Sequence, residues 1–221
     1  MALCVNGSIK KCINNGDVRG NGERIGGIAG EGSSESDISE CINNGIIIGD
    51  GNCVGGISGI EFGSIEKCMN SGKISGKKSE IGGIAGETGE STKISIKNNY
   101  NIGNIFIDLD KVTEIGGIIG FAYRGIINNN YSLGEIKIEG KNVQNIGGVL
   151  GFTNSTVERS NNYYLEKKSN VTLNTEGEEK DSKYMKSEDF LSKLNEGQNP
   201  AVWEYRTKEN DGYPVFIKTD E

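Results

Sequence analysis

The chain has 221 residues, of which 34 are glycine, about twice the usual share of about 7%, and 34% are hydrophobic residues other than glycine. A thick, multilayered core is therefore not expected, and a formal net charge of −7 argues against a surface for nucleic acid or for an anionic membrane. The sequence contains no histidine, which excludes Ser-His-Asp and Cys-His catalysis, HExxH peptidase chemistry and every histidine-ligated metal site.

Two motifs repeat along the chain with one shared period, and a fixed period is typical of solenoids and other repeat proteins. The first motif is a tetrad of the form Ile-Gly-Gly-Ile, which first occurs at residues 25–28. The second motif is aligned on Gly16, Gly45, Gly72, Gly103 and Gly134, which are 29, 27, 31 and 31 residues apart. The paired glycines of the tetrad are Gly26, Gly27, Gly55, Gly56, Gly82, Gly83, Gly116, Gly117, Gly147 and Gly148.

Equivalent positions of the repeats hold equivalent side chains. One column is aliphatic, with Ile9, Ile38, Ile65, Ile96 and Ile127, and a column of cysteine or asparagine follows it three residues later, with Cys12, Cys41, Cys68, Asn99 and Asn130. A unit of about 30 residues cannot bury so few apolar side chains alone, so we expect the repeats to stack with the aliphatic columns inside.

The predicted fold class is therefore all-β: a single-stranded parallel β-solenoid of about five coils, of either hand. Glycine and asparagine suit its corners because both reach left-handed backbone conformations at little cost. A helical repeat is disfavoured, since each glycine inside a helix costs about 1 kcal/mol.

The motif Ile-Gly-Gly-Ile-Ala-Gly, beside Cys-Ile-Asn-Asn-Gly-Asp-Val and Asn-Tyr-Asn-Ile-Gly-Asn-Ile, resembles the GLUG repeat of bacterial surface proteins over about residues 5–165. The resemblance implies an extracellular stalk or binding module, because GLUG repeats occur in adhesin-like proteins and in non-catalytic parts of IgA-specific metallopeptidases. The chain departs from those peptidases, since an HExxH helix requires histidine.

The C-terminal part of the chain loses the repeat. We expect residues 1–165 to form the solenoid, residues 166–182 a linker or long loop, and residues 183–221 a capping segment that covers a coil. Within that segment, Ser187 predicts the N-cap of a helix over about 187–196, followed by a strand and a turn at Asn210-Asp211-Gly212. The tail also weakly resembles the end of GLUG arrays.

The N-terminal end has only seven residues before Ser8, too few to cap a coil. We therefore expect either a fragment of a longer array or an end that associates with another molecule, in an end-to-end contact through the uncapped coil. No apolar stretch is long enough to span a bilayer, and the N-terminus lacks the pattern of a signal peptide.

Three of the five cysteines, Cys12, Cys41 and Cys68, share one column. Stacked strands are about 4.8 Å apart, so a disulfide between neighbouring coils is geometrically conceivable, but we favour unbridged thiols that pack as small side chains. A column of thiols spaced by whole coils cannot surround a zinc ion. Asn14, Asn43, Asn70 and Asn101, like Asn99 and Asn130, are expected to form structural ladders along the axis.

Carboxylates are the remaining acid, base and metal-binding groups. Asp108 and Asp110 are expected to point outward and are the candidate ligands for calcium, although no cofactor is otherwise indicated. Glu139 has the same offset in the next repeat as Asp108, and stacked carboxylates would match the spacing of a retaining glycosidase. A solvated surface is the simpler interpretation.

Aromatic residues gather in the later repeats. Tyr100, Tyr131 and Tyr163 continue a column that begins with aliphatic residues and are interpreted as packing residues. We expect the rings of Phe121, Tyr123 and Phe152 to face inward and fill a wider coil. The alternative is an outward stripe that binds a ligand, for which these three are the candidate residues.

The sequence thus predicts a non-catalytic extracellular repeat module of a bacterial surface or secreted protein. It would act as an adhesin-like stalk or ligand-binding spacer, with a host matrix protein or a cell-surface glycan as partner. Two alternatives stay open: a polysaccharide-active lyase or hydrolase that uses surface carboxylates, and a structural module for end-to-end assembly.

Overall fold

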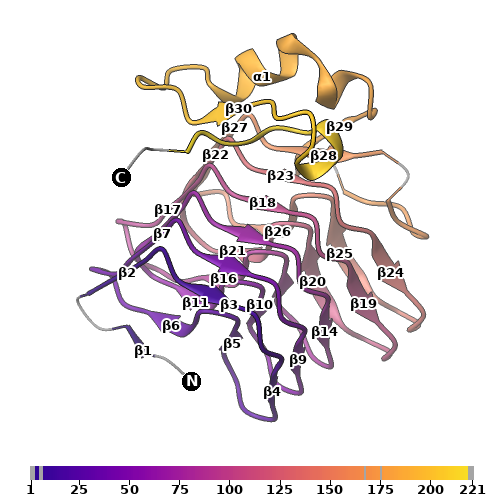
Figure 1. Ribbon diagram of the computed structural model, residues 1–221. Coiled ribbons are helices and arrows are strands. Elements are labelled where there is room, and N and C mark those ends of the chain that lie inside the picture. The colour runs from indigo at the N-terminus through magenta and orange to yellow at the C-terminus, as the bar shows by residue number, and fades with distance from the viewer. Residues whose placement is uncertain (1–2, 5–6, 167, 175, 219–221) are drawn as a thin grey trace.

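A computed structural model describes residues 3–4, 7–166, 168–174 and 176–218, and it confirms the predicted fold class (Figure 1). The chain winds into about five coils of short parallel strands, and each strand pairs with its equivalents in the coils before and after it. The stacks of equivalent strands form five parallel sheets, which we number I to V in the order in which one coil passes through them.

Each sheet collects one strand from each successive coil, in chain order. Sheet I contains β2 (Ser8–Lys10), β7 (Asp37–Ser39), β12 (Ser64–Glu66), β17 (Ser95–Lys97), β22 (Gly125–Asn128) and β27 (Val157–Ser160). Sheet II contains β3 (Ile13–Asn14), β8 (Ile42–Asn43), β13 (Met69–Asn70), β18 (Tyr100–Asn101), β23 (Tyr131–Ser132), β28 (Tyr163–Leu165) and β29 (Glu178–Lys180). Sheet III contains β4 (Val18–Gly20), β9 (Ile47–Gly49), β14 (Ile74–Gly76), β19 (Ile105–Ile107) and β24 (Ile136–Ile138). Sheet IV contains β5 (Ile25–Gly26), β10 (Val54–Gly55), β15 (Ile81–Gly82), β20 (Thr113–Gly116) and β25 (Gln144–Gly147). Sheet V contains β1 (Leu3–Cys4), β6 (Ala29–Gly32), β11 (Ser58–Glu61), β16 (Ala85–Thr88), β21 (Ile119–Ala122) and β26 (Leu150–Thr153).

The columns deduced from the repeats are the registers of these sheets. Ile38 of β7 pairs with Ile65 of β12, which pairs in turn with Ile96 of β17. These side chains are 0% exposed and belong to one of two buried clusters that fill the interior of the solenoid. The second cluster consists mainly of inward residues of sheets III and IV, such as Ile74 and Ile81. Burial of these aliphatic columns is the main stabilising contribution, at roughly 25 cal/mol per Å² of apolar surface.

The paired glycines allow the close approach of neighbouring coils. A Cβ atom at Gly27 would lie 2.3 Å from the carbonyl oxygen of Gly56, and one at Gly83 would lie 2.0 Å from that of Gly117. The structure describes all ten paired glycines, and none of them has a positive φ. Glycine was expected to suit left-handed corners, but these ten glycines serve another purpose: a Cβ atom would collide with backbone at nine of them and with the ring of Tyr164 at Gly148.

Left-handed corner positions are instead held by residues with side chains. The residue just before the cysteine and asparagine column has a φ between 50° and 58° in every coil: Lys11, Glu40, Lys67, Asn98, Asn129 and Asn161. A second corner precedes the paired glycines, at Arg24, Cys53, Glu80, Glu114 and Asn145. In the later coils asparagine holds the first of these left-handed corners, as expected. In the earlier coils lysine or glutamate holds it.

The column of cysteine and asparagine forms a hydrogen-bonded ladder along the axis. The side chain of Asn99 accepts from the backbone N–H of Cys68 at 2.9 Å and donates to the carbonyl of Ile65 at 3.0 Å. The Cys68 thiol occupies the same place one coil earlier, where it accepts from the N–H of Cys41 at 3.4 Å and donates to the carbonyl of Ile38 at 3.6 Å. Cysteine and asparagine can thus replace one another in this column because both supply a donor and an acceptor to the same backbone groups.

A second ladder is made of asparagine alone. The amide of Asn43 donates to Asn70 at 2.7 Å, and the amide of Asn70 donates to Asn101 at 2.8 Å. Each of these amides also bonds the glycine two residues later, as Asn43 does with the carbonyl of Gly45 at 2.9 Å. These bonds satisfy buried corner groups without water.

The segment expected to be a linker or long loop, residues 166–182, instead covers the last coil. Its described residues pair with that coil through β29 and through isolated bridges from Ser169 to Ile136 and from Asn174 to Gly147. Leu173 packs against both interior clusters. The segment therefore shields the aliphatic ends of the columns, which an irregular backbone can do when a few apolar side chains point inward.

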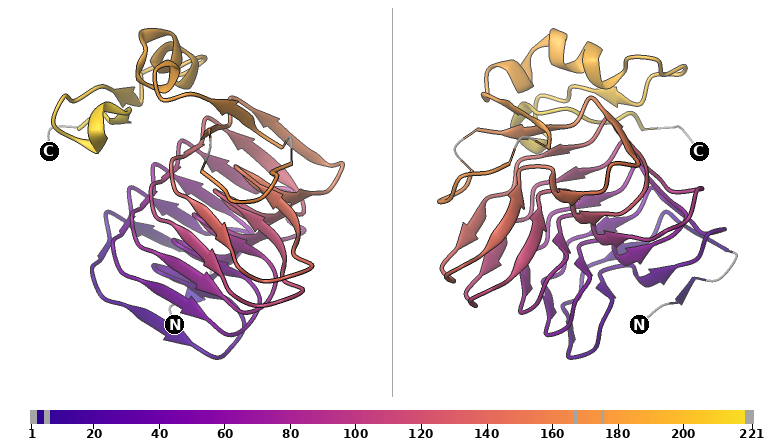
Figure 2. Two further views of the ribbon diagram at one scale, coloured as in Figure 1. Left: turned by 90° about the vertical axis from the view of Figure 1, so that its right-hand side faces the viewer. Right: turned by 180° about the vertical axis from the view of Figure 1, so that it is seen from behind.

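The capping segment lies along one side of the solenoid rather than over its end (Figure 2). It contains a 3-10 turn (Tyr184–Lys186), helix α1 (Glu188–Leu194), β30 (Trp203–Glu204), a second 3-10 turn (Asn210–Gly212) and β31 (Val215–Phe216). Ser187 is the N-cap of α1, and its hydroxyl accepts from the N–H of Phe190. No helix among the described residues is long and apolar enough to cross a membrane.

The cap docks on sheet II because the outward column of that sheet becomes aromatic in the later coils. Tyr100 and Tyr131 stack with ring centroids 5.2 Å apart, and Phe190 packs on Tyr163 with centroids 5.1 Å apart. Trp203, which is 1% exposed, completes this cluster. The packing role predicted for the tyrosines is thus fulfilled outside the coils, against the cap.

Candidate ligand-binding face

Three aromatic rings cluster on the outside of sheet V. Phe121 of β21 pairs in register with Phe152 of β26, and their ring centroids are 5.6 Å apart. Tyr123 follows β21, and its ring contacts Phe121 edge-on at 5.8 Å. Phe152 is 44% exposed. The structure therefore brings together the three residues that the sequence singled out as candidate ligand-binding residues.

The expectation that these rings fill the interior is wrong. Ile119 and Ala122 of β21 are the residues of this strand that belong to the buried interior cluster, and they leave Phe121 on the opposite side. The same column holds Glu31 and Glu87 in earlier coils, positions that are only partly buried. A column that accepts carboxylates in one coil and rings in another faces outward.

A hollow of about 430 Å³ adjoins Phe152 where the covering segment meets the last coil. Its walls combine the ring of Phe152 and the side chain of Leu173 with polar groups from Asn145, Thr153 and Thr172. Volumes of about 300–1,000 Å³ with an apolar wall and a few polar groups are typical of small-molecule sites. The hollow and the aromatic cluster together form what we call the aromatic face, made of Phe121, Tyr123, Phe152 and the residues around the hollow.

One carboxylate, Glu176, also lines the hollow, and an ion pair with Arg159 at 2.7 Å holds it. The amide of Asn174 is occupied as well, since it donates to the carbonyls of Leu150 and Gly151 at 3.0 and 2.6 Å. Two of the polar groups that line the hollow, Glu176 and Asn174, are therefore held by bonds to the scaffold. Fixed polar groups beside an exposed ring suit the binding of a polar ligand with an apolar face.

A group that could hold a metal ion lies where the left-handed corner before sheet IV meets sheet V. The thiol of Cys53 is 2.9 Å from a carboxylate oxygen of Glu80 and 3.2 Å from one of Glu87, and the three ligand atoms lie within 4.8 Å of one another. Burial, together with the two carboxylates, raises the pKa of the Cys53 thiol well above its usual value, and burial also raises the pKa of Glu87. The Cys53 thiol therefore keeps its proton at neutral pH when no cation is bound.

Sequence reasoning missed this corner because its residues belong to no spacing motif. The signal was present in the repeat alignment, since Cys53 and Glu80 both precede the first residue of their tetrads, as Arg24 does in the coil before. Arg24 forms an ion pair with Glu31 on the same face. The corner thus combines acidic groups with an arginine that already has a carboxylate partner.

The residues predicted to bind calcium, Asp108 and Asp110, are both exposed and lie after β19. Asp110 accepts from the backbone N–H of Lys141 at 2.6 Å. Glu139, the candidate partner in the next coil, pairs with Lys137 at 2.9 Å. Among the described residues, these carboxylates do not join a group of three ligands, so calcium binding and catalysis at this edge stay predictions.

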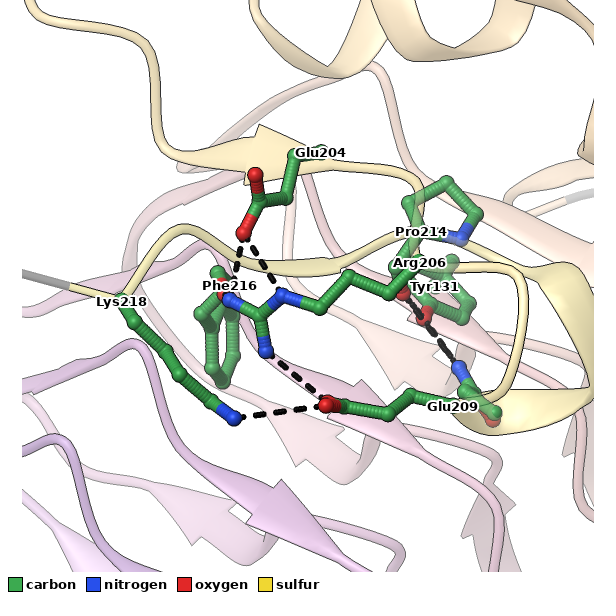
Figure 3. Close-up of polar contacts among 8 residues, drawn as sticks. Tyr131, Glu204, Arg206, Glu209, Pro214, Phe216 and Lys218 are labelled. Carbon is green, nitrogen blue, oxygen red and sulfur yellow. Dashed lines mark hydrogen bonds and ion pairs between the residues drawn. The ribbon is translucent and has the colours of Figure 1, made fainter.

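A groove of about 520 Å³ runs along sheet II beside the cap. Its floor is formed by Ile42, Met69 and Tyr100, which continue the column that the cap covers farther along, and Phe216 lies at its edge. Figure 3 shows how the wall on the cap side is held. Arg206 bonds the carbonyl of Phe216 at 2.7 Å and a carboxylate of Glu209 at 2.8 Å.

A hydrogen bond from the hydroxyl of Tyr131 to the carbonyl of Pro214 ties the same wall to the solenoid (Figure 3). Lys218 adds an ion pair with Glu209 at 3.3 Å. The polar groups on the cap side of the groove are therefore bonded to one another. We interpret the groove as a consequence of the way the cap attaches to sheet II.

In comparisons with known proteins, no protein-family model, no curated protein and no solved structure matches this chain.

Proposed function

We propose that this chain is a non-catalytic repeat module of a bacterial surface or secreted protein that binds a glycan on its aromatic face. The observation that supports the proposal is the cluster of Phe121, Tyr123 and Phe152, which lies outside the core and beside a polar hollow. The rings do not belong to the cluster that the cap covers. The placement of a set of aromatic rings on a solvated surface favours contact with a ligand.

A glycan is the ligand class that best fits these groups. Sugar rings have an apolar face of C–H groups and a rim of hydroxyls, so they pack on aromatic rings while hydrogen-bonding to amides and hydroxyls. The aromatic face offers both kinds of contact, with Asn145 and Thr153 beside Phe152. The rigid stack behind it lowers the entropic cost of binding, because strands in five sheets hold the face in place. The resemblance to GLUG repeats agrees with this role.

Retention on immobilised ligands tests the proposal. The chain is passed over soluble and immobilised polysaccharides and over host-matrix proteins, and newly released reducing ends are measured in the same samples. We expect retention on a polysaccharide without release of reducing ends. The Phe152→Ala variant is expected to bind at least tenfold more weakly, or about 1.4 kcal/mol.

The matched control is Ile126→Ala on β22, because Ile126 is also an exposed apolar residue, at 36%, but lies on sheet I. Retention that survives Phe152→Ala, or that falls equally in Ile126→Ala, would contradict the assignment of the face. Release of reducing ends would instead favour the polysaccharide-cleaving alternative. Retention on matrix protein alone would keep the adhesive role and replace the glycan as ligand.

A second candidate function is end-to-end assembly. Strands β2, β3, β4 and β5 lie at the edges of their sheets, and edge strands present unpaired backbone groups that another chain can bind. Light scattering over a range of concentrations tests it. A mass that stays that of one chain at all concentrations would count against assembly.

A further inference from the structure

The hydrogen-bonded ladder begins with three cysteines, which differ from its asparagines in chemistry and from one another in solvent exposure. Cys12, Cys41 and Cys68 stand in register on consecutive coils, and all three are free thiols. Cys12 is exposed, whereas Cys41 and Cys68 are buried. The thiol of Cys41 donates to the carbonyl of Ile9 in the coil of Cys12 at 3.5 Å, so it lies at the junction of the two coils. An exposed thiol beside a buried one on the neighbouring strand is an arrangement in which the first can react with a reagent and the second can resolve the product.

The geometry of the pair fits a covalent bridge. The residues that follow, Ile13 and Ile42, are direct partners in sheet II, and the N–H of Ile42 donates to the carbonyl of Cys12 at 2.8 Å. Neighbouring strands are about 4.8 Å apart, which lies within the Cα separations of about 4.4–6.8 Å that disulfides span. The two cysteines stand at equivalent positions of neighbouring coils, so a bridge needs side-chain rotation and no change of register.

The surroundings of Cys41 also favour its thiolate. Interactions with the Cys68 thiol, and then with the backbone and thiol of Cys12, lower the pKa of Cys41 to about 7 against the opposing effect of burial. Cys53 is the contrasting case, because burial and the carboxylates of Glu80 and Glu87 raise its pKa well above the usual value. A thiolate therefore forms more readily at Cys41 than at Cys53. Burial and the neighbouring Cys41 raise the pKa of Cys12, so the exposed thiol reacts through its ionised fraction, which grows above neutral pH.

We propose that Cys12 and Cys41 form a reactive dithiol site that takes low-molecular-weight disulfides as its substrate. The Cys12 thiolate attacks one sulfur of the disulfide RSSR, forms a Cys12–S–SR mixed disulfide and releases RS⁻. The Cys41 thiolate then attacks the sulfur of Cys12, breaks the bond to SR and releases a second RS⁻. Two protein thiols are oxidised to one disulfide, RSSR is reduced, and the two protons lost by the cysteines leave with two RSH.

The neighbouring pair, Cys41 and Cys68, does not react in this way, although its register is the same. Both of its thiols are buried, and the Cys68 thiol is engaged with the N–H of Cys41 and the carbonyl of Ile38. A dissolved disulfide reaches neither sulfur in the folded chain. Solvent exposure therefore restricts the reaction to the pair Cys12 and Cys41. The pair Cys41 and Cys68 serves as an internal control.

The experiment treats the folded, fully reduced chain with oxidised glutathione at pH 8 and counts the remaining thiols by alkylation and intact mass. The chain has five cysteines, so we expect the number of alkylated thiols to fall from five to three, with no glutathione retained. Peptide mapping is expected to show a single link between Cys12 and Cys41. A link that includes any other cysteine, or a chain that keeps all of its thiols, would overturn the proposal.

Two variants separate the steps. Cys12→Ser removes the point of attack and is expected to leave every remaining thiol free. Cys41→Asn places at this position the residue that the ladder uses in later coils, and it is expected to trap Cys12 as a stable mixed disulfide with glutathione. Cys53→Ser is the control and is expected to form the bridge unchanged. Failure of Cys41→Asn to trap glutathione on Cys12 would refute the two-step mechanism. None of these measurements depends on glycan binding.

Discussion

Replacement of Cys68 by alanine is expected to destabilise the chain by roughly 2–4 kcal/mol, while replacement by asparagine is not. The alanine variant leaves the buried N–H of Cys41 without its acceptor and removes the donor to Ile38. A buried donor without a partner costs about 1–3 kcal/mol, and loss of a buried heavy atom adds about 1 kcal/mol. Cysteine is usually regarded as a small hydrophobic residue, so this cost distinguishes a ladder position from ordinary packing.

The asparagine variant keeps both bonds. In the next coil Asn99 accepts from an N–H at 2.9 Å and donates to a carbonyl at 3.0 Å, shorter contacts than the corresponding thiol bonds of 3.4 and 3.6 Å. We expect Cys68→Asn to be within about 1 kcal/mol of the natural chain or more stable, since amide bonds are stronger than those of a thiol.

Urea unfolding followed by far-UV circular dichroism measures both variants, and hydrogen exchange at the Cys41 N–H reports the local bond directly. Exchange at this amide is expected to quicken in Cys68→Ala and to stay slow in Cys68→Asn. The reasoning is refuted if the alanine variant is within about 0.5 kcal/mol of the natural chain, or if the asparagine variant is destabilised as much as the alanine variant.

Two further changes test the interior and the coil spacing. Burial raises the pKa of Glu61 to about 7 from the usual 4.5, so the folded state holds a proton that the unfolded state releases. The free energy of unfolding is then expected to fall by roughly 3 kcal/mol as pH rises from 4.5 to 7, and Glu61→Gln is expected to abolish that fall in urea titrations at several pH values. Gly45→Ala places a Cβ atom 2.0 Å from the carbonyl of Gly16 and is expected to cost about 3 kcal/mol or more. Gly16→Ala, at the same position of the repeat, has its nearest neighbour at 3.7 Å and is the control; equal thermal midpoints for the two variants would contradict the steric argument.

The solenoid could be predicted from the sequence because its period is fixed by two independent motifs. In a parallel stack, residues with the same offset become direct neighbours, so the columns of the alignment are the registers of the sheets, as for Ile65 and Ile96. The ladder of cysteine and asparagine could be deduced for the same reason. The reason why cysteine and asparagine replace one another could not be deduced. It becomes clear only when the backbone N–H and carbonyl that both side chains bind are located.

The orientation of Phe121 and the position of the cap were not predicted correctly. Strict alternation would place Phe121 on the same side as Ile119, but Ile119 and Ala122, three residues apart, both face the interior. Alternation therefore does not hold along β21, and the sequence alone does not show where it breaks. The cap was expected at the coil end because that end needs cover. Residues around Leu173 provide that cover, and the aromatic surface of Tyr131 and Tyr163 attracts the cap instead.

The outward columns, and not the repeats as such, decide where function can be located. The inward columns remain aliphatic from coil to coil, since each must match its neighbours above and below. The outward column of sheet II changes from Met69 to Tyr100, and that of sheet V changes from Glu87 to Phe121, between the same two coils. One of these changes creates the surface that the cap buries, and the other leaves rings in solvent beside a hollow. The same strand pairing continues through all the coils, so surface chemistry is what places the proposed glycan site in the later ones. A ligand that bound the earlier coils equally well would have to use carboxylates rather than rings.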